Sequence, residues 1–206
     1  GAELSQTIVE SYIEGDQRII DRSARAEFLS QSSPMGGLFG SAADVPPAQL
    51  ARQIGQTSTL SAMDLGKMPD LIDRFNQLSL ALQNSKQQAV ARARTYALSF
   101  TSIFGNQVPP SYIDLGSFLQ ILMEGANNAR VTAASEDVLT AMQQAVISEK
   151  HGTKKSGATG ITIYFPNSQL YQSAVTGAES YTAIADRFAD ETLWDDFLAY
   201  HYTGQK

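Results

Sequence analysis

Two histidines, His151 and His201, carry the only imidazole rings in the sequence, and imidazole is the commonest acid–base group in enzymes. A hydrolytic site would also need a nucleophile and an orienting carboxylate, roles that Ser156 and Asp195 are chemically able to fill. However, His151 lies in a polar, lysine-rich stretch and His201 near the end of the sequence, which favours solvated surface histidines. No serine stands in a nucleophile elbow, so the sequence disfavours an independent serine hydrolase.

Acidic side chains gather late in the sequence and offer the hard oxygen ligands that Ca²⁺ prefers. The cluster consists of Asp186, Asp190, Glu191, Asp195 and Asp196. Glu191 and Asp195 would share one face of a helix, as many solvated acidic pairs do. The cluster lacks the Asp-x-Asp-x-Asp-Gly loop, and two histidines without cysteine do not make a zinc site. We therefore expect no cofactor in this chain and keep calcium as the alternative.

Glycine-rich and lysine-rich stretches suggest anion binding at first sight. Neither 36–40 nor 157–160 is followed by Lys-Ser/Thr, so both are interpreted as turns and not as phosphate cradles. Lys150, Lys154 and Lys155 form a basic tip that could contact an acidic partner, but charged side chains also keep strand edges soluble. The second interpretation is favoured.

Composition excludes several classes of function. There is no cysteine, which rules out disulfides, thiolate metal sites and a cysteine nucleophile within this chain. A net charge of -6 disfavours a nucleic-acid partner, because nucleic-acid affinity depends on clustered Lys and Arg. Apolar runs are far shorter than the roughly 20 residues of a membrane span. Gly1 does not resemble a native start, so we expect a cut or engineered N-terminus.

The spacing of apolar residues predicts a mainly α chain with a few strands, an α+β fold. Stretch 23–47 is rich in Gly, Pro and Ser and is expected to be a loop or insertion. Helices are expected over 2–13, 50–54, a stretch led by Asp64 and ending near 84, a stretch from Gln87 toward Gly105, a stretch capped by Asp114, and 132–144. Strands are expected over 57–63, 146–149 and 161–165, and we expect the last two to pair like a β-hairpin across a mobile connection.

Aromatic residues concentrate in the last third of the sequence and are candidates for a contact with a partner or a neighbouring domain. Those that we single out are Tyr164, Phe165, Trp194 and Phe197. A local core is an equally good interpretation of Trp194, because loss of a buried aromatic side chain would cost about 3–5 kcal/mol in either environment.

Three segments together resemble the C-terminal half of clostripain-like cysteine peptidases, which are related to caspases, gingipains and legumains. The segments are Thr59-Leu60-Ser61-Ala62-Met63-Asp64-Leu65, Tyr112-Ile113-Asp114-Leu115 with Phe118, and Gly160-Ile161-Thr162-Ile163-Tyr164-Phe165-Pro166 followed by Tyr171, Tyr181, Phe188, Trp194, Phe197 and Leu198. Their order and spacing carry the resemblance, which covers about residues 57–202.

The resemblance implies a non-catalytic, helical C-terminal subdomain over 57–206, preceded by an N-terminal helix and loop over 1–56. In that family a His and Cys pair lies upstream in an α/β domain, so no catalytic residue carries over to this chain. The implied partner is that upstream domain, or a second chain carrying it, and the implied substrate is a peptide bond after a basic residue such as Arg. The implied location is extracellular or the cell envelope of a bacterium. The alternative is a stand-alone helical interaction module without enzymatic activity.

Overall fold

The computed structural model describes residues 1–11, 55–100, 111–173 and 177–204. The chain divides into two compact units. Unit 1 consists of Gly1–Ala62 with Ile147–Gly160, and unit 2 consists of Met63–Val146 with Ile161–Lys206. In this division the chain leaves unit 1 at Ala62 and returns to it between Ile147 and Gly160, and the expected boundary at residue 56 stays a prediction. The expected loop over 23–47 and helix over 50–54 lie outside the described residues.

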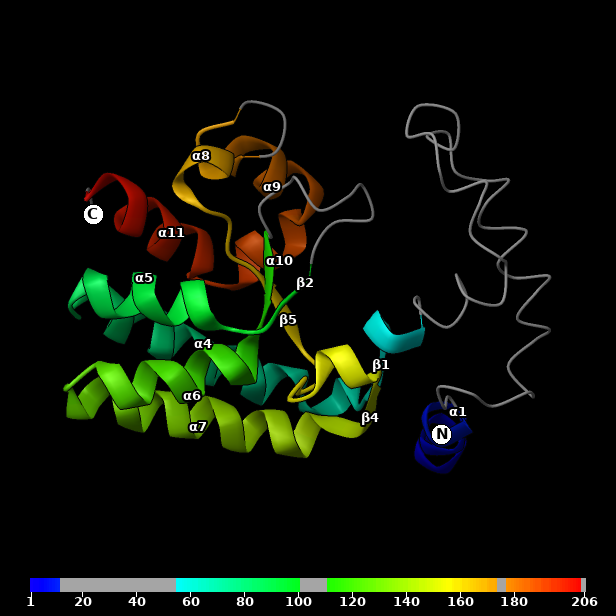
Figure 1. The fold of residues 1–206 in the computed structure, drawn as a ribbon. Helices are drawn as coiled ribbons and strands as arrows, with labels where there is room; N and C mark the ends of the chain where they lie inside the picture. The colour runs from blue at the N-terminus through cyan, green and yellow to red at the C-terminus, as the bar shows by residue number, and fades with distance from the viewer. Residues whose placement is uncertain (12–54, 101–110, 174–176, 205–206) are drawn as a thin grey trace, which may run out of the picture. The chain divides into compact units, whose positions relative to one another are not determined.

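The described part of unit 1 includes a helix near the N-terminus and a two-stranded ribbon (Figure 1). Its elements are α1 (Ala2–Ser11), β1 (Thr59–Met63), β4 (Val146–His151) and the 3₁₀ turn η3 (Thr153–Lys155). Strands β1 and β4 form a two-stranded sheet. The amide of Gly152 donates to the carbonyl of Ser58, and the amide of Asp64 donates to the carbonyl of Ala145, so the strands run antiparallel.

Unit 2 is a helical bundle with a small antiparallel sheet. Its first half contains η2 (Leu65–Lys67), α4 (Met68–Gln83), α5 (Gln87–Tyr96), β2 (Ser99–Phe100), β3 (Tyr112–Asp114), α6 (Leu115–Gly125) and α7 (Ala129–Ala145). Its second half contains β5 (Thr162–Tyr164), α8 (Ser168–Tyr171), α9 (Ala178–Ile184), α10 (Asp186–Glu191) and α11 (Trp194–Thr203). Figure 1 shows α4, α5, α6 and α7 lying side by side. The expected fold class, mainly α with a few strands, is confirmed.

The core of unit 2 lies between these helices because their apolar residues recur at helical spacing. On α4 the buried positions include Leu71, Phe75, Leu78 and Leu82. Matching side chains come from α6, which buries Phe118, Leu119 and Leu122, and from α7, which buries Val131, Val138 and Met142. Helix α7 packs against both α4 and α6.

Helix starts follow the capping chemistry of the sequence. The carboxylate of Asp64 accepts from the amide of Gly66 at η2, and that of Asp114 accepts from the amide of Ser117 at α6, so both expected caps are confirmed. Helix α7 begins earlier than expected, because Asn128 accepts from the amides of Arg130 and Val131.

One expectation about strand pairing and one about the length of a helix were wrong. Strands β4 and β5 do not pair with each other, since β4 pairs with β1 and β5 pairs with β3. The helix from Gln87 does not reach Gly105 but ends at Tyr96, where Ala97 takes an extended conformation. Strand β2 follows, with Ser99 opposite Ile113 and Phe100 opposite Tyr112. Local apolar spacing did not reveal these long-range backbone partners.

One buried hydroxyl leads to a stability prediction. Ser135 on α7 is fully buried, and among the residues that the structure describes none forms a hydrogen bond with its Oγ. We expect Ser135→Ala to stabilise the protein by about 1 kcal/mol, because it removes an unpaired buried polar group and improves helix propensity. Urea unfolding monitored by circular dichroism measures the change.

Ser79 provides the matched control, because it is also fully buried on a helix but donates to the carbonyl of Phe75. Ser79→Ala should therefore stabilise the protein less than Ser135→Ala. Equal effects of the two substitutions would contradict the assignment of Ser135 as an unsatisfied group.

Candidate functional site

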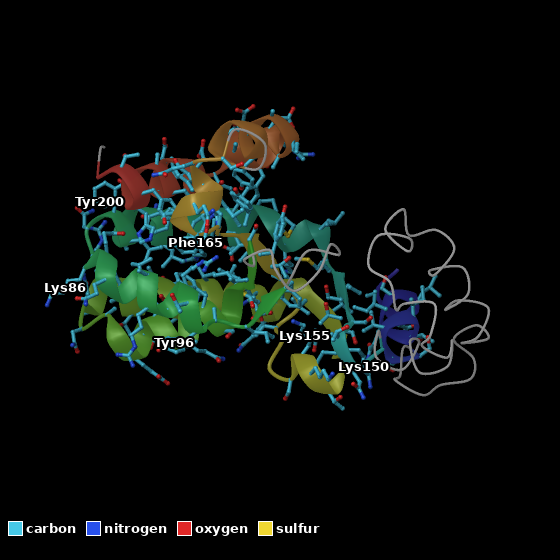
Figure 2. All side chains as sticks on the ribbon, turned by 45° about the horizontal axis from the view of Figure 1, so that its top comes forward. Lys86, Tyr96, Lys150, Lys155, Phe165 and Tyr200 are labelled. Carbon is cyan, nitrogen blue, oxygen red and sulfur yellow. The ribbon has the colours of Figure 1, made fainter. Side chains whose placement is uncertain are left out.

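The aromatic candidates meet at the end of strand β5, around Phe165 (Figure 2). Phe165, Trp194 and Phe197 are each 0% exposed and Tyr164 is 7% exposed. The Phe165 ring contacts Trp194 edge-on at a centroid distance of 5.3 Å and Phe197 at 6.0 Å. These side chains form the local core of unit 2, which was one of the two interpretations of Trp194. A partner contact through them would require that core to open.

Three consecutive backbone carbonyls, of which the first belongs to the last residue of β5, each accept a hydrogen bond from a side chain. The indole Nε1 of Trp194 donates to the carbonyl of Tyr164 at 2.7 Å. The Nε of Arg94 donates to the carbonyl of Phe165 at 3.0 Å, and the hydroxyl of Tyr202 donates to the carbonyl of Pro166. The segment Tyr164-Phe165-Pro166 is therefore fixed to α5 and α11. We call it the anchored segment.

Tyrosines line the anchored segment in stacked pairs. Tyr164 stacks on Tyr181 at 4.4 Å, and Tyr171 stacks on Tyr202 at 4.5 Å. Burial, with the neighbouring Tyr112 and Tyr171, raises the pKa of Tyr164 to about 12. Burial also raises the pKa of Tyr181. These phenols stay protonated near neutral pH, so they pack and form hydrogen bonds instead of acting as phenolate bases.

The two histidines have different environments. His151 is exposed in unit 1, where its Nδ1 lies 2.9 Å from Oε2 of Glu149. His201 is half-buried on α11, and its Nδ1 lies 2.7 Å from Oε1 of Gln87. The expectation of a solvated surface histidine was wrong for His201, because α11 turns this ring toward Phe165 and α5. Within the described part of the chain, no serine hydroxyl bonds to either imidazole.

The acidic cluster is divided between two helices. Helix α10 ends at Glu191 and α11 begins at Trp194, with Thr192 extended between them. The expectation that Glu191 and Asp195 share a helix face was therefore wrong. Glu191 instead accepts from Arg187 at 2.9 Å, and burial raises the pKa of Asp195. In the ranges that the structure describes, no three His, Asp or Glu side chains are grouped to hold a metal ion.

The basic tip and the glycine stretch belong to unit 1. Lys150 lies on β4, and Lys154 and Lys155 lie in η3. Gly157 and Gly160 adopt positive φ, as the expected turn requires. Gly36–Gly40 lies outside the described residues. None of the helices that can be described is long and apolar enough to cross a bilayer.

Arg94 and Gln87 are the residues that sequence reasoning missed. Both lie on α5, a helix whose Ala-rich sequence indicated close packing but not polar contacts with the end of the chain. The signal that could have revealed them was a cation, Arg94, and an amide, Gln87, on a helix whose buried face consists of small residues.

Comparison of the chain with family models, curated proteins and solved structures finds no match.

Proposed function

We propose that this chain is the non-catalytic C-terminal scaffold of a clostripain-like cysteine endopeptidase, which acts with an upstream domain carrying the His and Cys pair. The observation that carries the proposal is the structural role of the three segments that resemble the family. Asp64 and Asp114 cap helix starts, and Tyr164 to Pro166 form the anchored segment. The distinctive side chains of these segments thus serve capping and packing.

The second and third of these segments are joined to each other within unit 2. Strand β3 of the second segment pairs with β5 of the third, with Ile113 opposite Ile163 and Asp114 opposite Thr162. The amide of Leu115 also donates to the carbonyl of Ile161. These contacts support a conformational role for residues that lie far apart in the sequence. With no cysteine in the chain, the thiol chemistry of such a peptidase must come from elsewhere.

The ribbon of unit 1 supports a docking role. Strands β1 and β4 have five and six residues, and a two-stranded sheet of this size is only marginally stable alone. Among the described residues, no further strand lies along either outer edge of the ribbon. An outer edge offers main-chain donors and acceptors to a strand of another domain. In the proposed enzyme this strand belongs to the upstream α/β domain, and this chain needs no cofactor of its own.

The test is complementation of activity. The chain, the domain encoded directly upstream of Gly1, and an equimolar mixture are assayed on matched peptides with Arg or Ala before the scissile bond. We expect no cleavage by the chain alone, weak cleavage by the upstream domain, and at least about tenfold faster cleavage of the Arg peptide by the mixture, since a scaffold that positions catalytic groups contributes strongly to rate.

Two controls make this experiment decisive. Phe165→Ala, which disrupts the core of unit 2, should remove the stimulation, whereas Tyr96→Ala, at a side chain that is 70% exposed, should retain it. Cleavage by the isolated chain would contradict the proposal. A mixture no faster than the upstream domain alone would favour the stand-alone interaction module.

A further inference from the structure

The side chain of His201, on α11, contacts both α5 and the anchored segment. Its ring lies 5.4 Å from the ring of Phe165, 5.7 Å from that of Phe197 and 4.8 Å from that of Tyr202. Gln87, at the start of α5, binds its Nδ1. The imidazole thus packs among aromatic rings, as an apolar side chain would, and forms one hydrogen bond.

The hydrogen bonds of Gln87 determine which nitrogen of His201 carries the proton. The Nε2 of Gln87 donates to the carbonyl of Leu82 at 2.8 Å and to that of Ser85 at 3.2 Å. Carbonyls only accept, so the amide nitrogen of Gln87 faces them and its Oε1 faces His201. Because Oε1 also only accepts, Nδ1 of His201 must donate. The neutral ring is therefore the Nδ1–H tautomer, and Nε2 is the position for a second proton.

The groups around His201 disfavour protonation of its Nε2. Arg94, one of the residues on α5 beside the ring, contributes a fixed positive charge, and Gln87 contributes a neutral amide. The anchored segment contributes the Phe165 ring, and α11 contributes Phe197 and the neutral phenol of Tyr202. Among the described residues no carboxylate acts on the imidazole and no group accepts a hydrogen bond from Nε2. Aromatic rings offer some cation–π attraction, but they cannot replace lost hydration.

We propose that His201 is an acid-sensitive latch, whose protonation releases α11 from α5 and from the anchored segment. The proton adds to Nε2, and the resulting imidazolium leaves the interface to regain water and to move away from Arg94. Consistent with this geometry, burial, assisted by Arg94, lowers the pKa of His201 to about 4 from an ordinary value near 6.5. The proposal does not depend on a catalytic partner.

The sign of the pH dependence follows from this lowered pKa. The unfolded chain takes up the proton near pH 6.5, and the folded chain only near pH 4. The contribution to stability is therefore complete above pH 6.5 and is lost as the pH falls toward 4. Within this window the opening constant of the interface should rise by up to about tenfold for each pH unit.

Trp194 is the single tryptophan and lies at the start of α11, so its fluorescence reports this interface. We expect acrylamide quenching of Trp194 to increase at least about threefold between pH 7 and pH 4.5 in the full chain, while far-UV circular dichroism shows that the other helices persist. His201→Asn should lose most of this increase, because Asn keeps a donor for Gln87 but cannot be protonated.

His151→Asn is the matched control, because His151 is exposed and belongs to unit 1. It should show the same quenching increase as the unmodified chain. If His201→Asn lacks a native spectrum at pH 7, His201→Phe provides the non-titrating ring. An equal increase in the unmodified chain and in the non-titrating His201 variant overturns the latch.

Discussion

Phe165→Ala is expected to destabilise unit 2 by about 3–5 kcal/mol, the cost of removing a large aromatic ring from a core that cannot collapse into the space. Phe165 is 0% exposed, and besides the rings already described it meets Phe118 edge-on at 5.6 Å. The cavity would lie between Phe118 of α6 and the rings of Trp194 and Phe197 on α11. Urea unfolding followed by Trp194 fluorescence measures the change.

Tyr96→Ala is the control for this prediction, because the side chain of Tyr96 lies at the end of α5 and is 70% exposed (Figure 2). The free energy of unfolding of the Tyr96→Ala variant should differ from that of the unmodified chain by no more than about 0.5 kcal/mol. Phe165→Leu keeps an apolar side chain and should fall between the two. Similar unfolding midpoints for Phe165→Ala and Tyr96→Ala would mean that Phe165 is not central to the core.

Gly152→Ala is expected to disrupt unit 1, at a cost of about 3 kcal/mol or more, although it adds only one methyl group. A Cβ at this position would lie 2.1 Å from the carbonyl oxygen of Gly55 and 2.5 Å from the carbonyl carbon of Gln56. Both contacts are with backbone, which cannot rotate away as a side chain can. Relief requires Gly152 and residues 55–56 to move apart, which strains the neighbouring bond from the Gly152 amide to Ser58.

Hydrogen exchange of the β1 and β4 amides reports this change directly. Gly157→Ala is the matched control in unit 1, because its Cβ meets nothing within 4 Å and only its positive φ of 91° resists substitution. It should cost about 1 kcal/mol, as expected for a left-handed residue. Unchanged protection of β4 in Gly152→Ala would show that the strand is not held against residues 55–56.

The sequence predicted local features such as helix caps and buried helix faces. It did not predict which distant segments of the chain contact each other. Asp64 and Asp114 precede helix starts, and the spacing of Leu71, Phe75, Leu78 and Leu82 places one face of α4 in the core. These signals act over a few residues. The pairing of β5 with β3 depends instead on backbone groups about fifty positions apart, and no periodicity encodes it.

The candidate site shows the same limit. The sequence pointed to Phe165 and Trp194 as an important aromatic group, and the structure brings them together. It did not indicate that Arg94 and Gln87 on α5 meet residues of α11, because polar residues on an amphipathic helix are ordinarily solvated. Nor did it indicate that His201 is half-buried, which depends on where α11 lies in three dimensions.

Two of the three side chains that hold the anchored segment, Trp194 and Tyr202, are supplied by α11. During synthesis, a nascent chain that has exposed residues 164–166 therefore still lacks the groups that fix them, and must wait until residue 202 has left the ribosome. A chain that has been synthesised only as far as residue 166 contains Phe165 without Trp194, Phe197 and Tyr202, which contact its ring in the folded state. Formation of α11 is therefore the step that completes the anchored segment.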